Sequence, residues 1–383
     1  MAAINMMEST SMDRRNFLRL GVTAGAVIVA ANVVPGFSWA DVRQVKLDDC
    51  MAMSPEKMVG KSKLIKDSWQ YLQTTVATIK DAKVRNVVTA MVSDPVPTFL
   101  APLADGKKEK VWNELKTKSL IEGVALADFL PPIADIKKSP QPFNTAPGSG
   151  YQSHHAYPGG VVTHTALNLR VALAIYQHYK ETYGYTLDRD AIIASQVLHD
   201  IHKGWVFQWG SDGSSRTELK LAGTGEHHIY SLAESISRGV PAEICVAQAC
   251  AHNHPGTAKD EAEVVSWIQA ATILLGVDPV AKGLLAGDGK TLPLPRRMEG
   301  FVCHLGDHDY VLSVPAVQWL LPEMLAIAKE KYKMSEDDLR GKKFNAFRNY
   351  AFSQATAMNL YHHYSIAGKT GLVEKLTAMI APA

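Results

Sequence analysis

Histidines gather in one stretch of this 383-residue chain. Ten of its fourteen histidines lie between residues 154 and 254, and one of them, His199, is followed directly by Asp200. Neutral imidazole is the commonest metal ligand in proteins, and helical bundles build metal sites by projecting ligands inward from facing helices. Several histidines on successive helices, one beside a carboxylate, therefore predict a metal centre. A single histidine on an apolar helix face would predict only a buried core residue.

Four short segments carry these histidines in order and at helix-sized spacings. They read HHAYPGGVVTHT (154–165), VLHDIHK (197–203), EHHI (226–229) and AHNHPG (251–256). Together they resemble the motifs of the HD superfamily of metal-dependent phosphohydrolases, and most closely those of bacterial HD-domain exoribonucleases and their relatives. The resemblance covers about residues 150 to 280.

The resemblance implies a metal site in which the aspartate of the His-Asp doublet is shared between two ions. The implied ligands of the first ion are His164, His199 and Asp200, and His228 and His252 would complete the second. Imidazole and carboxylate ligands suit iron, manganese, nickel or zinc, so we expect one or two divalent transition-metal ions without a choice among these elements. Such an ion lowers the pKa of bound water and generates hydroxide near neutral pH.

One position departs from the superfamily pattern. A later helix should supply an aspartate to the first ion, but the best alignment of residues 261–272 places Gln269 there. A neutral amide oxygen is a weaker ligand than a carboxylate, so the departure bears on catalysis more than on fold. Asp278 is the nearest downstream alternative, although its place beside Pro279 favours a cap or turn residue.

The candidate catalytic residues are Asp200 and Lys203. The resemblance implies that Lys203, one helical turn beyond the doublet, places a positive charge near a phosphate oxygen; the alternative is a solvated surface lysine. Residues expected to orient ligands or contact substrate are Tyr157, His202, His227, His254 and Arg216. The segment HLGDHD (304–309) also carries ligand-capable side chains, and it is interpreted as a lid, a separate surface site or a polar turn.

Helical periodicity dominates the regions that must position these residues. Apolar spacing predicts helices over 60–82, 84–92, about twenty residues from Gly160, 187–200, 225–239, 241–253, 260–275, 315–332 and 335–366. Residues 301–313 are compatible with a short β-hairpin. Because no alternating βα units occur, the fold class is predicted to be all-α, an HD-type helical bundle with helical extensions. A linker rich in Pro, Gly and Ser at 138–150 suggests an N-terminal helical region at 41–145, a metal-binding core at 146–285 and a C-terminal extension at 286–383.

The first forty residues resemble an export signal. Arg14-Arg15 precedes Phe17-Leu18, an apolar run extends from Leu20 to Val34, and Ser38-Trp39-Ala40 fits a cleavage site. Paired arginines followed by x-Phe-Leu indicate the twin-arginine export machinery. The mature chain is therefore expected to begin near Asp41 in the periplasm, with no membrane span after removal of the signal. An uncleaved anchor or a buried helix is the alternative.

The composition of the chain limits the classes of molecule that it is expected to bind. With a formal net charge of +2 and 20% charged residues, the chain lacks the basic surface expected of a nucleic-acid-binding protein, so a small phosphorylated substrate is expected. Cys50 and Cys303 leave the disulfide question open in an oxidising compartment. Cys245 and Cys250, five residues apart, are interpreted as buried small hydrophobes.

Three functions remain open at this point. The first is hydrolysis of a phosphate ester or phosphodiester by metal-activated water. The second is oxygenation of a small molecule by a di-iron centre, for which export of a folded, cofactor-loaded protein is the motive. The third is a non-catalytic binding protein with a degenerate site, for which Gln269 is the motive. The oligomeric state cannot be predicted from the sequence.

Overall fold

Side-chain caps mark where many of the helices begin. In the computed structural model, which describes residues 36–104 and 106–382, Ser54 accepts a hydrogen bond from Lys57 N at the start of α3, and Asp81 does the same for two amides of α5. Asp188 caps α9 and Thr257 caps α13. Such caps satisfy backbone amides that have no partner inside the helix.

The N-terminal region is a series of mostly short helices. Its elements are η1 (Trp39–Asp41), β1 (Val45–Lys46), α2 (Leu47–Ala52), α3 (Pro55–Lys61), α4 (Lys63–Val76), α5 (Ala82–Ser93), η2 (Thr98–Leu100), α6 (Ala101–Ala104), α7 (Lys108–Thr117) and η3 (Phe143–Thr145). Residues 118–142 carry no regular helix or strand.

The central region holds the histidine motifs. Its elements are α8 (Gly160–Tyr183), α9 (Arg189–Leu198), α10 (Lys203–Val206), β2 (Lys220–Leu221), β3 (Thr224–Gly225), α11 (Glu226–Ser237), α12 (Ala242–Ala249) and α13 (Ala258–Leu275). The antiparallel β2–β3 pair turns through Ala222-Gly223, both with positive φ, as a two-residue hairpin requires.

The C-terminal region contains two long helices, α15 and α17. Its elements are α14 (Met298–Gly306), α15 (Tyr310–Tyr332), α16 (Glu336–Arg340), α17 (Lys342–Met379) and β4 (Ile380–Ala381), and β4 pairs in parallel with β1. The backbone of α17 leaves the helical conformation at Thr356 and Gly368, so α17 consists of three consecutive helical segments. The prediction of an all-α fold is confirmed, because the strands among the described residues are two residues long.

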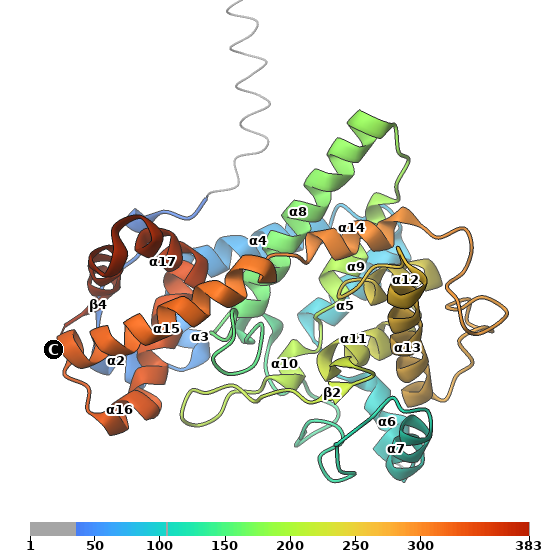
Figure 1. Ribbon diagram of the computed structural model, residues 1–383, viewed down its shortest axis with the longest axis horizontal. Coiled ribbons are helices and arrows are strands. Elements are labelled where there is room, and N and C mark those ends of the chain that lie inside the picture. The colour runs from blue at the N-terminus through green and yellow to red at the C-terminus, as the bar shows by residue number, and fades with distance from the viewer. Residues whose placement is uncertain (1–35, 105, 383) are drawn as a thin grey trace, which may run out of the picture. The chain divides into compact units, whose positions relative to one another are not determined.

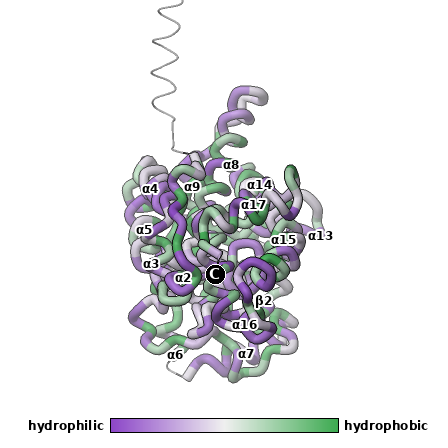
Figure 2. Tube along the Cα trace, turned by 90° about the vertical axis from the view of Figure 1, so that its left-hand side faces the viewer, coloured by the Kyte–Doolittle hydropathy of each residue, from purple (hydrophilic) through white to green (hydrophobic). Residues whose placement is uncertain are grey.

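Helix α8 positions the site. It packs against α4, α9 and α14, and its first turns are buried whereas its last turns extend beyond the neighbouring helices (Figure 1). Those last turns are mostly hydrophilic (Figure 2). A Cβ atom at Gly160 would lie 2.0 Å from the carbonyl oxygen of His155. Glycine therefore lets the His155 loop approach the start of α8.

Two predictions for the C-terminal region are wrong. Residues 301–313 form no hairpin; they belong to α14, a short turn and the first residues of α15. Helix α15 also begins at Tyr310 rather than at Pro315, and both Pro315 and Pro322 lie inside it. By length and composition, the stretch Met298–Tyr332 is the one part of the described chain apolar enough to cross a membrane. That stretch comprises two helices joined by Asp307–Asp309, which enter the site described below.

The paired arginines and the apolar run of the predicted signal lie outside the described residues. Trp39, at the expected cleavage site, donates a 2.8 Å hydrogen bond from Nε1 to His363 on α17, and the ammonium of Lys375 lies 5.1 Å from the Trp39 ring centroid. Cleavage after Ala40 would remove this contact. All four cysteines are buried and free. Burial raises the pKa of Cys250 to about 12, which leaves its thiol in the unreactive protonated form.

Candidate metal centre

Four side chains from three helical regions converge on one point. His164 Nε2 on α8 lies 3.0 Å from Asp200 Oδ2 and 3.1 Å from Asp307 Oδ1. His199 Nε2, at the end of α9, lies 3.2 Å and 3.4 Å from the same two oxygens. We call His164, His199, Asp200 and Asp307 the primary ligand set.

The primary ligand set has the spacing that a transition-metal ion requires. Ligands bonded to a common ion at about 2.0–2.2 Å are separated from one another by about 3 Å, as these nitrogens and oxygens are. His199 Nε2 and Asp200 Oδ1 are buried, and no hydrogen-bond partner satisfies them within the described residues, whereas Asp200 Oδ2 has the ammonium of Lys203 at 2.7 Å. Buried polar atoms without partners are costly, and a bound cation would satisfy both.

Hydrogen bonds from neighbouring residues orient the side chains of the primary ligand set. His199 Nδ1 lies 2.7 Å from the carbonyl oxygen of Gln196, so Nδ1 carries the proton and Nε2 presents its lone pair. Asn168, one turn after His164 on α8, donates a 2.6 Å hydrogen bond to Asp307 Oδ1. Asp307 itself follows the last residue of α14 directly.

A second ligand set shares Asp200. His227 Nε2 lies 3.4 Å from Asp200 Oδ1, and one ligand atom from each of Asp200, His227 and His252 falls within 4.8 Å of the other two. Glu218 Oε2 lies 2.5 Å from His227 Nδ1 and thereby leaves Nε2 free to bind metal. His252 Nε2 lies 3.7 Å from Asp307 Oδ2. The two ligand sets therefore fit a pair of ions joined by the carboxylate of Asp200.

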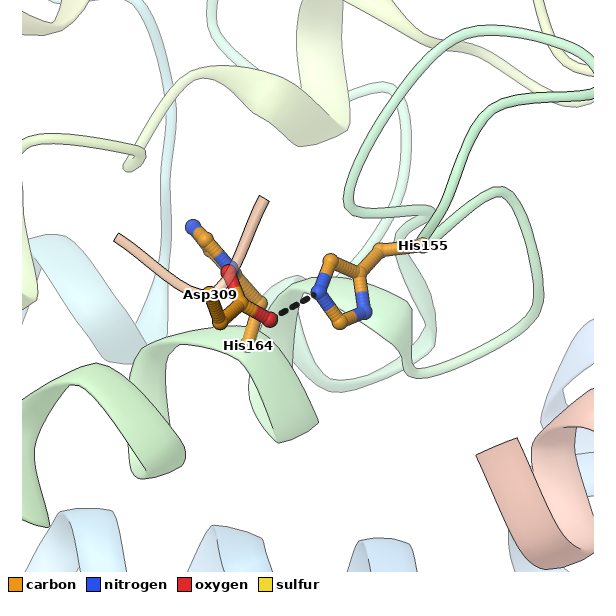
Figure 3. Close-up of side chains that lie close together, drawn as sticks. All are labelled: His155, His164 and Asp309. Atoms are coloured by element: carbon orange, nitrogen blue, oxygen red, sulfur yellow. Dashed lines mark hydrogen bonds and ion pairs between the residues drawn. The ribbon is translucent and has the colours of Figure 1, made fainter. Parts of the chain in front are cut away.

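Behind His164 lies a further carboxylate–imidazole pair. Asp309 Oδ1 is 3.3 Å from His164 Nδ1, and Asp309 Oδ2 is 2.9 Å from His155 Nε2. Figure 3 shows the Asp309 carboxylate between the rings of His155 and His164. A carboxylate on the far nitrogen of a metal-binding histidine fixes the tautomer and the ring orientation. Asp309 therefore places negative charge beside the ring nitrogen of His164 that faces away from the primary ligand set.

The charge balance of the site favours a cation. Asp200, Asp307, Asp309 and Glu218 bring four carboxylates, against one lysine, Lys203, whose Nζ lies 2.7 Å from Asp200 Oδ2. Burial favours neutral imidazole at His199, but Asp200 and Asp307 outweigh it and raise the pKa of His199 to about 9. The same surplus of negative charge would attract a divalent ion.

Several predicted site residues lie in other surroundings. The prediction for Gln269 is not met, because its amide donates to the carbonyl oxygen of Gly289 and Asp307 supplies the carboxylate instead. His228 stacks on His252 but directs Nε2 to the carbonyl oxygen of Ala249; burial lowers its pKa to about 3. Its neighbour His227 joins the second ligand set in its place.

The residues predicted to orient ligands or contact substrate lie in different parts of the structure. Tyr157 is buried beside Thr163, with its hydroxyl 3.3 Å from His155 Nδ1. His202 Nε2 lies 3.7 Å from Glu234 Oε2, and Arg216 forms an ion pair with buried Glu226. His254 packs against Phe301 and His304. Tyr157 connects with the primary ligand set through His155, Asp309 and His164, and His227, also predicted as a support, contacts Asp200 directly.

A cavity of about 470 Å³ opens on both ligand sets. Tyr151, Phe207, Tyr310 and Val314 line it together with polar residues. Lys203 also lines it with a side chain only 7% exposed, so it is not a solvated surface lysine. The charged and imidazole lining residues are His154, His164, Lys203, Glu218, His227, His252 and Asp307.

Comparison with known proteins finds a partial match to a phosphodiesterase. The chain is 32% identical over 123 residues to the dihydroneopterin 2',3'-cyclic phosphate phosphodiesterase of Methanocaldococcus jannaschii. That match covers 31% of this chain and 48% of the relative, so the chain spans about half the length of the curated relative it matches. No protein-family model matches the chain, and no solved structure matches it significantly. Over part of its length, the chain is similar to a phosphodiesterase.

Proposed function

We propose that this chain is a metal-dependent phosphohydrolase that cleaves a phosphate ester or phosphodiester of a small molecule or nucleotide. The observation that carries the proposal is the convergence of His164, His199, Asp200 and Asp307 with mutual distances of 3.0–3.4 Å beside a cavity. Partial similarity to a phosphodiesterase supports the same reaction class, and a cyclic phosphodiester is the first substrate to test.

A divalent ion bound by these ligands would supply hydroxide near neutral pH and polarise a phosphoryl oxygen. The chain's own residues do the remaining work. Lys203, held by Asp200, directs positive charge into the cavity, where it would bind a phosphate oxygen. His154 also lines the cavity; burial is the main cause that lowers its pKa well below the usual range, so its imidazole is neutral.

The alternative of a degenerate site rested on a neutral amide in place of a carboxylate. Asp307 Oδ1, 3.1 Å from His164 Nε2 and 3.4 Å from His199 Nε2, supports a carboxylate ligand from a later segment instead. Oxygenation by a di-iron centre would use the same shared Asp200, and oxygen consumption by the iron-loaded protein tests that chemistry separately.

The decisive assay follows release of phosphate, or opening of a 2',3'-cyclic phosphate, by protein loaded in turn with iron, manganese, nickel or zinc. We expect hydrolysis to require metal and to fall below detection in the His199→Ala and Asp200→Ala variants. Gln269→Ala serves as the matched control and should keep full activity. Equal turnover by the wild type and both ligand variants would overturn the proposal, as would the absence of turnover with every metal.

A further inference from the structure

The cavity beside the metal ligands has an aromatic wall that the hydrolytic chemistry does not require. Tyr151, Phe207, Tyr310 and Val314 line it together with the ligands. Phe207 packs against the ring of His227, 5.6 Å between centroids, and so has a role in the ligand set. Within the described residues, the hydroxyl of Tyr151 bonds to Asn345 and the ring of Tyr310 packs on His308, and neither partner belongs to a ligand set. Their presence in the wall calls for a separate explanation.

Tyr151 is held in place from behind. Its hydroxyl donates a 2.8 Å hydrogen bond to Asn345 Oδ1 on α17, and the guanidinium carbon of Arg348 lies 4.7 Å from its ring centroid. Arg348 is 1% exposed, and it forms no salt bridge with any carboxylate of the described residues. Its Nε and Nη1 have no hydrogen-bond partner among the described residues. Burying a cation in this way is costly.

Arg348 Nη2 donates a 3.0 Å hydrogen bond to Asn349 Oδ1, and the Tyr151 ring compensates a further part of the buried charge. A desolvated cation on a tyrosine face is a strong contact of its type, and it fixes the plane of the ring. The buried guanidinium of Arg348 thus restricts the motion of the Tyr151 ring. A rigid ring in a cavity wall is suited to stacking against a flat ligand, because little conformational freedom is lost on binding.

Tyr310 is tied to the metal site through the backbone. It is the residue after Asp309, which contacts His155 and His164, and it is 46% exposed. An exposed tyrosine directly beside the ligand-bearing turn lines the same cavity as Tyr151. The cavity volume of about 470 Å³ is within the range of ordinary small-molecule sites.

We propose that the Tyr151–Tyr310 wall binds a planar aromatic group of the phosphoester substrate, and that Arg348 positions Tyr151 for this contact. The substrate class is thus a phosphate ester that carries a heteroaromatic ring, with the phosphate at the metal ligands and Lys203 and the ring against the tyrosines. This inference rests on the proposed function and specifies the substrate for it.

A matched pair of cyclic phosphodiesters tests the inference in the metal-loaded protein. Adenosine 2',3'-cyclic phosphate carries the ring, and ribose 2,3-cyclic phosphate lacks it. Stacking of a base on an aromatic side chain contributes about 1–3 kcal/mol, roughly a 5- to 150-fold difference. We expect the base to lower KM within this range and to change kcat little. Tyr151→Leu should remove most of that difference, whereas Tyr151→Phe should retain it.

Arg348 requires a test that separates positioning from folding. Arg348→Met should raise KM for the adenosine substrate but leave KM for the ribose substrate unchanged, and Arg348→Lys should restore part of the loss. Tyr183→Leu, on the exposed end of α8, is the control and should change neither KM. Thermal unfolding of each variant checks that the fold is kept.

Failure of the inference can be told apart from failure of the proposed function. If neither cyclic substrate is hydrolysed, the affinities of adenosine 3'-phosphate and ribose 5-phosphate, measured by titration calorimetry, replace KM. Equal values of KM or affinity with and without the base would overturn the inference, as would an undiminished preference in Tyr151→Leu. Loss of binding to both compounds in Tyr151→Leu would also overturn it.

Discussion

Asp200 directs its two oxygens to different partners. Oδ2 faces His164, His199 and Lys203, whereas Oδ1 faces His227. A carboxylate that serves two ligand sets cannot be replaced by its amide without weakening both. Asp307 also lies between the sets, because Oδ1 faces His164 and His199 and Oδ2 faces His252.

Asp307→Ala should therefore abolish stoichiometric metal binding. The variant removes a charged member of the primary ligand set and leaves two buried imidazoles without it. Elemental analysis of purified protein measures the effect, and Gln269→Ala, a residue bonded to Gly289, should bind as much metal as the wild type. Full metal content in Asp307→Ala would contradict the assignment.

Glu218→Ala should weaken the second ligand set without destroying it. Glu218 fixes the tautomer of His227 through a 2.5 Å contact, and loss of such a supporting carboxylate typically costs roughly 10- to 100-fold in metal affinity or activity. Competition with a chelator measures the affinity. Glu181→Gln, near the exposed end of α8, is the control, and a similar effect in both variants would contradict the role of Glu218.

At the scale of elements, helix type and order follow from apolar spacing, whereas contacts between distant elements do not. The helix predicted at 225–239 is α11, and that predicted at 260–275 is α13, to within two residues at each end. The hairpin expected at 301–313 is wrong because residues on both sides of the polar Asp307-His308-Asp309 turn are helical. Among these helical residues, the side chains of Val302 in α14 and Ser313 in α15 are buried.

Because of the same error, Asp307 and Asp309, which are two of the four carboxylates at the site, were not assigned to it from the sequence. His164, His199 and Asp200 could be found because local motifs contain them. Asp307 and Asp309 belong to a segment that looks like a surface turn, and only tertiary folding brings it to α8. Glu218 had no local signal at all, since it lies in a loop. Asn168, one turn from His164, could have been suspected from helical spacing alone.

Helix α11 is fastened to η2 by a buried carboxylate with consequences for acid stability. Glu234 accepts hydrogen bonds from Thr98 Oγ1, Phe99 N and Arg238 Nε. Burial raises its pKa, but His202, Arg238 and Thr98 outweigh burial and lower the pKa from 4.5 to about 2. Because the folded-state pKa is the lower one, the stabilisation is complete above about pH 4.5 and is lost as the pH falls toward 2.

Glu234→Gln should lower the free energy of unfolding by about 3 kcal/mol at pH 7, since each unit of pKa shift corresponds to about 1.4 kcal/mol. The difference between wild type and variant should shrink as the pH falls from 4.5. Urea unfolding at several pH values measures it. Glu336→Gln, which breaks an exposed ion pair with Lys329, should have little effect at any pH. A pH-independent difference for Glu234→Gln would contradict the linkage.

At the scale of the whole molecule, residues from Ser38 onward form one compact unit. The N-terminal helices α4 and α5 pack on α8 and α9, and α17 contacts α2, α3 and α4. The three regions predicted from the sequence therefore meet in one body, and the site draws its ligands from two of them.

We also propose that the protein reaches the periplasm by twin-arginine export. Changing both Arg14 and Arg15 to lysine should leave the protein in the cytoplasmic fraction, because that route depends on the arginine pair. Cell fractionation followed by immunoblotting measures the distribution. Arg19→Lys, in the same segment, is the control and should be exported normally. Unchanged export of the double variant would contradict the route.

The distance along the chain between His164 and Asp307 sets an order of events during biosynthesis. A ribosome must translate past residue 307 before the last carboxylate of the primary ligand set exists, so a nascent chain that ends earlier lacks a complete ligand set. Acquisition of metal thus becomes a late event that reports completion of the polypeptide. For a protein exported already folded, the cytoplasmic metal pool, rather than that of the destination, would determine which element is carried out.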